Sequence, residues 1–166
     1  MDIWFQDEAR VGQQGTTTRM WEKKGTRPRA IKQGGFLSAY IFAAVCPKTG
    51  LSSAVIMPEV NGEVMQIHLD MISKELAPGR HAVIVTDRAP WHTTAKITVP
   101  HNISLLFLPA YSPELNGAEK IWDFMRQHEL ANRAFSSYDE IVEACCVAWK
   151  ALINEPGRVN RTYAAA

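Results

Sequence analysis

The sequence has little of several features that would assign it to a class at once. It has three cysteines in 166 residues, and the adjacent pair Cys145 and Cys146 has neither zinc-site spacing nor a C-x-x-C redox arrangement. No apolar run approaches the roughly 20 residues that a membrane-spanning helix needs, and the acidic start MDIWFQDEAR lacks the basic and apolar segments of a secretory signal. We therefore expect buried thiols, no membrane partner and a cytoplasmic location, associated with the nucleoid if the source is bacterial.

Motifs of common nucleotide-binding and hydrolase folds are also missing. There is no Walker loop and no G-x-G-x-x-G. Ser112, His92 and Asp87 would allow a hydrolase triad by composition, but no G-x-S-x-G elbow presents the serine. With 46% hydrophobic and 21% charged residues, the chain has the length and composition of one globular domain with one core, so we expect residues 1–166 to form a single domain.

Positive charge is concentrated in one segment although the whole chain carries a net charge of only +1. Between residues 19 and 32 the only acid is Glu22, and the segment is rich in Gly, Thr and Pro, which indicates an exposed loop or ribbon. A solvated face is the commoner meaning of such a run, and a loop that contacts phosphates is the alternative. The basic residues of the segment are Arg19, Lys23, Lys24, Arg27, Arg29 and Lys32.

Hydrophobic patterning predicts a mixed α/β domain. The runs FLSAYIFAAVC and LSSAVIMPEV are joined by PKTG, where Gly50 suits a hairpin turn, and Asn61 caps the helical pattern that follows. The predicted order β β β α β α β α α indicates a mixed five-stranded sheet with helices packed on it. Strands are expected at 3–8, 36–46, 51–60, 81–87 and 102–110, and helices at 61–76, 90–97, about 113–130 and about 137–153.

Two aspartates fall where apolar strands end. Asp7 lies near the exit of the first strand, and Asp87 closes the apolar run HAVIVT. Ligands of open α/β sheets bind beyond the carboxyl ends of the strands, so both side chains reach one crevice if the first and fourth strands are neighbours. Glu119 lies about 100° from Ala118 around its helix, on the flank of the buried face, and makes a third candidate.

Three carboxylates around one crevice repel one another unless a cation compensates them. Mg²⁺ and Mn²⁺ prefer oxygen ligands and are commonly held by carboxylates together with phosphate oxygens of a substrate. Two such ions stabilise the attacking and the leaving oxygen in phosphodiester displacement. The acids therefore predict a metal-dependent site for phosphoryl chemistry.

At these residues the sequence resembles the catalytic domain of a DDE transposase of the IS630/Tc1/mariner type. The segments that carry the resemblance are FQDEAR, MWEKKGTRPR, VTDRAPWH and LPAYSPELNGAEKIW. It implies an RNase H-like fold with helices on both faces of the sheet. It also implies that Asp7, Asp87 and Glu119 hold two Mg²⁺ or Mn²⁺ ions for DNA cleavage and strand transfer.

The same resemblance implies binding partners, and the sequence differs from the family pattern at some positions. It implies double-stranded DNA, both transposon ends and target, as substrate and a homodimer as the active assembly, with Arg88 and the basic segment on the DNA backbone. Gly117 stands where the family usually has proline, and 31 residues separate Asp87 from Glu119, fewer than the family pattern suggests. No helix-turn-helix region precedes Asp7, so we expect that DNA-binding region to be absent.

Alternatives remain open at individual residues and for the function. Asn116 and Glu119 also fit a capping box, Glu8 is expected on the strand face opposite Asp7, and His92 either assists a phosphate or is structural. These residues, Glu8, His92 and Asn116, are secondary candidates. A nuclease or resolvase without joining activity, or an inactive domain that binds DNA or protein, are the alternative functions.

Overall fold

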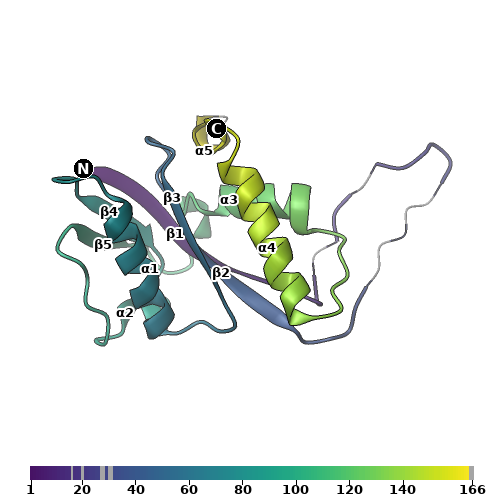
Figure 1. Cartoon of the computed structure of the whole chain (residues 1–166), viewed down its shortest axis with the longest axis horizontal. Coiled ribbons are helices and arrows are strands. Elements are labelled where there is room, and N and C mark those ends of the chain that lie inside the picture. Colours follow the sequence, from purple (N-terminus) through teal and green to yellow (C-terminus); the bar gives the residue numbers. More distant parts are fainter. Residues whose placement is uncertain (16, 20, 27–28, 30–31, 165–166) are drawn as a thin grey trace.

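The computed structural model describes residues 1–15, 17–19, 21–26, 29 and 32–164. Its centre is a five-stranded sheet in the order β3-β2-β1-β4-β5 (Figure 1). The first three strands pair antiparallel, β4 pairs with β1 in parallel, and β5 pairs with β4 in parallel. The predicted mixed sheet is therefore confirmed. The strands are β1 (Asp2–Gly12), β2 (Ser38–Val45), β3 (Ser52–Met57), β4 (Ala82–Thr86) and β5 (Ile103–Phe107).

Helices cover both faces of the sheet, as the resemblance to RNase H-like domains implied. One face carries α1 (Gly62–Glu75) and α2 (Pro90–Thr93). The Asn61 side chain accepts from Val64 N at 2.9 Å, which confirms the predicted cap of α1. Trp4, Phe42, Leu69 and Ile84 are fully buried between this face and α1.

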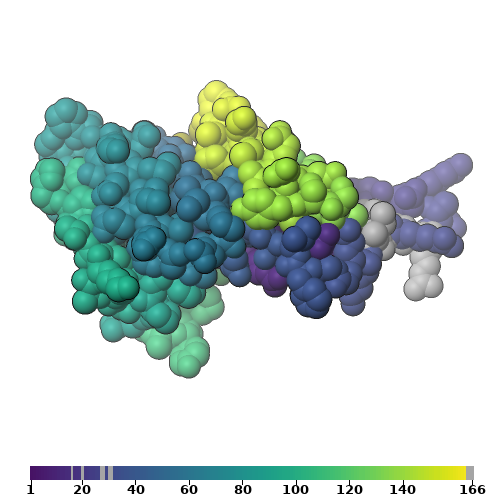
Figure 2. All heavy atoms as spheres, turned by 60° about the horizontal axis from the view of Figure 1, so that its bottom comes forward, coloured from purple at the N-terminus to yellow at the C-terminus, as the bar shows by residue number. Residues whose placement is uncertain are grey.

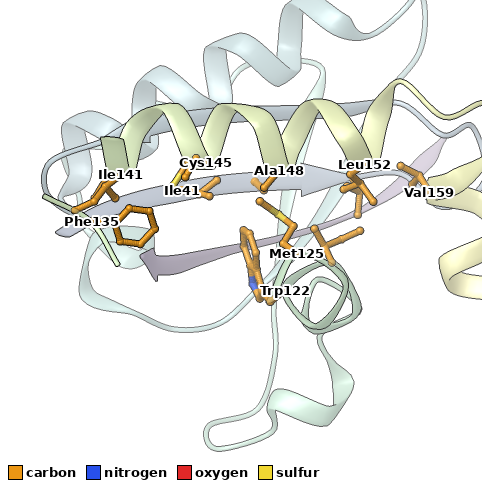
Figure 3. Packing of buried hydrophobic residues seen from close by; sticks show 14 residues of the cluster. Ile41, Trp122, Met125, Phe135, Ile141, Cys145, Ala148, Leu152 and Val159 are labelled. Carbon is orange, nitrogen blue, oxygen red and sulfur yellow. The ribbon is translucent and has the colours of Figure 1, made fainter. Parts of the chain in front are cut away.

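The other face packs against α3 (Glu119–Met125), α4 (Tyr138–Ile153) and α5 (Arg158–Ala164). Apolar residues of α4 point at β2, and Trp122 and Met125 of α3 fill the space beside them (Figure 3). Ile121 and Met125 are at most 1% exposed. Because α3 is anchored by these buried side chains, the start of the helix, where Glu119 lies, has a fixed position beside the sheet.

Four elements differ from the sequence-based expectation. Helix α2 ends at Thr93 and not at residue 97, because the backbone is extended at Thr94. β1 continues to Gly12, because its second half pairs with β2 along the full register from Phe5↔Val45 to Gly12↔Ser38. The helix expected at 113–130 is interrupted at Asn116, where the extended backbone separates η1 (Pro113–Leu115) from α3, and α3 continues into the π-helical turn η2 (Arg126–Leu130). Helix α5 had no predicted counterpart.

In the connection between β1 and β2, the described residues among 13–37 form an arm that extends away from the body of the domain (Figure 2). Its base is fixed to the segment before α4. The side-chain amides of Gln13 and Gln33 each donate to Phe135 O at 2.9 Å, and Phe135 N donates to Gln33 Oε1 at 2.6 Å. Among the described residues, no helix is both long and apolar enough to cross a membrane.

Candidate active site

The register of β1 against β4 places the first two acids side by side. The parallel pairing runs from Asp2↔Ala82 to Phe5↔Val85, and β4 ends at Thr86. Asp7 therefore lies in the middle of β1, not near its exit as expected, but just beyond the end of its parallel neighbour. Asp87 follows directly after that neighbour, so the crevice beyond a strand end is present for the reason the sequence suggested.

Glu119 opens α3 and faces the same space. Asp7, Asp87 and Glu119 together line a cleft of about 420 Å³, whose opposite wall is the segment between β5 and η1. The side chains of Asp87 and Glu119 are 55% and 43% exposed, so both carboxylates are accessible from solvent. The structure thus brings the three acids of the sequence prediction to one cleft.

The surroundings of Asp7 change the pKa of its carboxyl group. Burial raises its pKa from 3.8 to about 6, and the charges of Glu8 and Glu119 act in the same direction. A hydrogen bond from Trp122 Nε1 to Asp7 Oδ2, 3.0 Å long, opposes the rise. A carboxylate that is partly desolvated and repelled by its neighbours gains from a cation in the cleft.

Behind the cleft, His92 links two carboxylates. Its Nε2 lies 2.8 Å from Glu8 Oε1 and its Nδ1 lies 2.7 Å from Asp87 Oδ1. Burial of the ring disfavours its charged form, but the hydrogen bonds and charges of Glu8 and Asp87 outweigh this, so the pKa of His92 is raised. Since both nitrogens face carboxylate oxygens, only the doubly protonated ring donates to both.

This arrangement decides between the two interpretations of His92. Its side chain is fully buried and both of its nitrogens are engaged, so it does not reach out to a phosphate. Glu8 points to the α2 side while Asp7 points to Trp122 on α3, which is the opposite orientation predicted for adjacent residues of a strand. His92 and Glu8 therefore support Asp87 from behind.

Asn116 holds the turn before Glu119 and forms no capping box with it. Its Nδ2 donates to Gln6 O at 3.0 Å, and its Oδ1 accepts from Ala118 N at 3.1 Å. The Asn116 N–H donates to Pro113 O, so the carboxylate of Glu119 is left facing the cleft. Because Gln6 directly precedes Asp7, Asn116 joins the strand of the first acid to the turn of the third.

A second cavity adjoins the cleft. Asp7 and Glu119 also line a space of about 250 Å³ between β1 and η2, together with Trp122 and Arg126. Arg126 Nη2 lies 3.8 Å from Glu119 Oε2 and 2.7 Å from Asp123 Oδ1. Sequence reasoning missed Trp122 and Arg126 as neighbours of the acids. Trp122 and Arg126 follow Glu119 by three and seven residues, a spacing that places all three on one face of a helix. This spacing was the signal in the sequence that could have found them.

The predicted DNA-contacting cations lie in two places. Arg88 lines the acidic cleft, where its Nε donates to Leu108 O at 3.1 Å and its guanidinium lies 6.0 Å from the Phe107 ring centroid. The arm cations are exposed and do not line the cleft, and Arg27 lies outside the described residues. The described ones are Arg19, Lys23, Lys24, Arg29 and Lys32.

Metal binding by the acids stays a prediction. In the part of the chain that the structure describes, no three side chains of His, Cys, Asp or Glu are arranged to hold one ion jointly. The cleft brings carboxylates together from β1, from the end of β4 and from α3.

Comparison with known proteins places the chain in a family. Residues 2–142 match the family described as DDE superfamily endonuclease. An uncharacterized protein, y4pE/y4sA, of Sinorhizobium fredii (strain NBRC 101917 / NGR234) is 48% identical over 121 residues, which are 73% of this chain and 90% of that protein.

Solved structures agree on the fold. A Mos1 transposase paired-end complex with left transposon end has a TM-score of 0.69 at 19% sequence identity, and the match covers 97% of this chain. The Mos1 mariner paired end complex with Mn has a TM-score of 0.69 at 18% sequence identity, and that match also covers 97% of this chain. The chain spans about half the length of those proteins, 51% of each. These structures show an RNase H-like fold. By its match over residues 2–142, the chain belongs to the DDE superfamily endonuclease family.

Proposed function

We propose that this chain is the catalytic domain of a metal-dependent DNA transposase, which cleaves DNA phosphodiester bonds and joins the resulting 3′ ends to a target. The observation that carries the proposal is the shared cleft of Asp7, Asp87 and Glu119. The family match and the names of the similar structures, which are transposase complexes with transposon ends, support it. The narrower IS630-type assignment and the organisation of residues 1–166 as a single domain remain predictions.

The three carboxylates fit Mg²⁺ or Mn²⁺. Such ions need only one or two carboxylates when water and substrate phosphate oxygens complete the shell, so a closed cage of three protein ligands is not required. Asp7, Asp87 and Glu119 would hold two ions, and two ions together stabilise the attacking and departing oxygens of a phosphodiester. One of the similar structures is a Mos1 complex with Mn and another is a complex with Mg.

The chain's own residues prepare this site. The hydrogen bond from Trp122 fixes Oδ2 of Asp7, and the contacts with His92 Nδ1 and Ala89 N fix Oδ1 of Asp87, so both carboxylates are held in place at the cleft. Arg88 at the rim supplies a positive charge for a DNA phosphate. Carboxylates held in this way lose little side-chain entropy when a ligand arrives.

DNA backbone binding would come from the arm. Its described cations are exposed on a segment that projects from the body, which suits contact with a duplex too large for the cleft (Figure 2). Contacts to phosphates give affinity and orientation but carry no sequence information. A homodimer on paired transposon ends belongs to the same proposal.

Nicking of a supercoiled plasmid in Mg²⁺ or Mn²⁺ tests the proposal. Asp87→Asn and Asp7→Asn are expected to abolish nicking while circular dichroism shows an intact fold. Asp70→Asn, on the exposed side of α1, is the matched control and is expected to cut at the wild-type rate. Undiminished nicking by both active-site variants would remove the acids from the mechanism.

A joining assay separates the alternatives. A duplex with a pre-cleaved 3′-OH end is supplied with target DNA, and a joined product is expected. Cleavage without joined product would favour a nuclease or resolvase. If calorimetry detects no Mn²⁺ binding at millimolar concentration, the inactive binding domain is favoured instead.

A further inference from the structure

Gly117 lies where no side chain fits. A Cβ at this position would lie 2.8 Å from Cε1 of Tyr163 and 2.9 Å from Cγ and Cδ2 of Phe5. The φ of Gly117 is not positive, so close approach and not backbone conformation requires glycine here. The glycine at position 117 is therefore matched to Tyr163, 46 positions later in the chain.

Tyr163 of α5 makes three contacts at this turn. Its hydroxyl donates to Gly117 O at 2.7 Å. Its ring stacks on Phe5 with 6.0 Å between centroids, and Lys120 Nζ lies 5.5 Å from its centroid. Burial raises the pKa of Tyr163, so its hydroxyl keeps the proton that it donates.

The turn is thus held from two sides. Asn116 ties it to Gln6 O on β1, and Tyr163 ties it to α5. The Gly117 carbonyl also accepts from Lys120 N at 3.2 Å, so the bond from Tyr163 ends on the first turn of the helix that Glu119 opens. A seven-residue helix has little rigidity of its own, so its start depends on such contacts.

We propose that Tyr163 is a positioning residue for Glu119: α5 clamps the turn at residues 116–118 and so sets the place of the Glu119 carboxylate relative to Asp7. Tyr163 lies beyond residue 142, where the family match ends. The inference rests on the proposed function, because it assigns α5 a part in forming the acidic site.

Amide hydrogen exchange over residues 113–122 and calorimetric Mn²⁺ titration test the clamp. Tyr163→Phe removes the hydroxyl but keeps the ring, and it is expected to speed exchange in this segment and weaken Mn²⁺ binding by about three- to tenfold, the effect of one hydrogen bond. Tyr138→Phe is the matched control, because Tyr138 packs partly buried against the same core. The control is expected to leave both measurements at wild-type values.

A second set of variants tests the match between glycine and tyrosine. Gly117→Ala is expected to weaken Mn²⁺ binding and speed exchange more in the wild-type background than in Tyr163→Ala. Removing the Tyr163 ring relieves the 2.8 Å contact with the methyl group and gives Phe5, which stacks on that ring, space to shift away. Independent, multiplying effects of the two substitutions would overturn the proposal.

The outcomes separate this inference from the proposed function. If Tyr163→Phe leaves exchange unchanged, or changes exchange but not Mn²⁺ affinity, the clamp does not position Glu119. If the wild type binds no Mn²⁺, the proposed function fails, and exchange in Tyr163→Phe alone decides whether the clamp exists.

Discussion

The indole Nε1 of Trp122 donates a hydrogen bond to Asp7 Oδ2 across 3.0 Å, from the helix that Glu119 opens to the strand of the first acid. The donor stabilises the ionised carboxylate and so restrains a pKa that burial raises to about 6. It links two candidate ligands that are far apart in the sequence. The strength of that link can be measured.

Replacing Trp122 by Phe keeps most of the buried ring and removes the donor. We expect the pKa of Asp7 to rise above its wild-type value, and the free energy of unfolding at neutral pH to fall by about 1–2 kcal/mol. Carbon-detected NMR titration of the carboxyl groups measures the pKa. Trp149→Phe on α4 is the control for ring size, and an equal shift of Asp7 in that variant would contradict the assignment.

Asp7→Asn is expected to stabilise the metal-free protein above the pKa of Asp7. The folded-state pKa of about 6 exceeds the ordinary 3.8, so protonated Asp7 favours folding below pH 3.8, and this contribution is lost as pH rises through 6. At pH 8 the variant should gain about 1–3 kcal/mol, and at pH 4 much less. Urea unfolding at both pH values checks this, and a gain independent of pH would contradict it.

Glu8→Gln keeps a hydrogen-bond acceptor for His92 but removes the charge behind it. The pKa of His92 is raised in the native protein, so its contribution to stability is present below the ordinary 6.5 and is lost as pH rises through the raised value. We expect the variant to lose about 1–3 kcal/mol near pH 6, with a smaller difference at high pH, and the pKa of His92 to fall. Proton NMR of the imidazole follows the pKa. Glu143→Gln, on the exposed side of α4, should change neither quantity.

Replacing Lys23 and Lys24 by Ala tests the arm as a phosphate-binding surface. If each lysine neutralises one phosphate, the slope of log K against log salt should fall by about 0.9 per lysine, with similar weakening on any DNA sequence. Fluorescence anisotropy with a labelled duplex over a salt series gives the slope. Lys150→Ala, in the last turn of α4, is the control. An unchanged slope in the double variant would place the DNA elsewhere.

Much of the fold was predictable because its signals are local. The hairpin at Gly50, which has a φ of 75°, the cap of α1 by Asn61 and the buried strand that ends just before Asp87 each follow from neighbouring residues. The helix at 113–130 was predicted as one piece because its apolar spacing is nearly continuous. Its division at Asn116 depends on a bond from Asn116 to Gln6, 110 positions away, and no local pattern reports that contact.

The candidate site was also predictable only in part. Asp7, Asp87 and Glu119 could be chosen from the sequence, since each lies at the end of an apolar run or on a helix flank. The role of His92 could not be chosen from the sequence. The same residues are compatible with an imidazole that lies between two carboxylates and with one that faces a phosphate. Only the fold brings Glu8 and Asp87 to its two nitrogens.

The sequence by itself determined most of the helices and strands, their order and which acids are the candidate ligands, because hydrophobic periodicity, caps and turn residues act over a few positions. The tertiary structure alone decided which groups hold Asp7 and Asp87 in place and why residue 117 is glycine. Those depend on contacts such as that of Gly117 with Tyr163, which form only when strand pairing and helix packing have brought distant segments within hydrogen-bond distance.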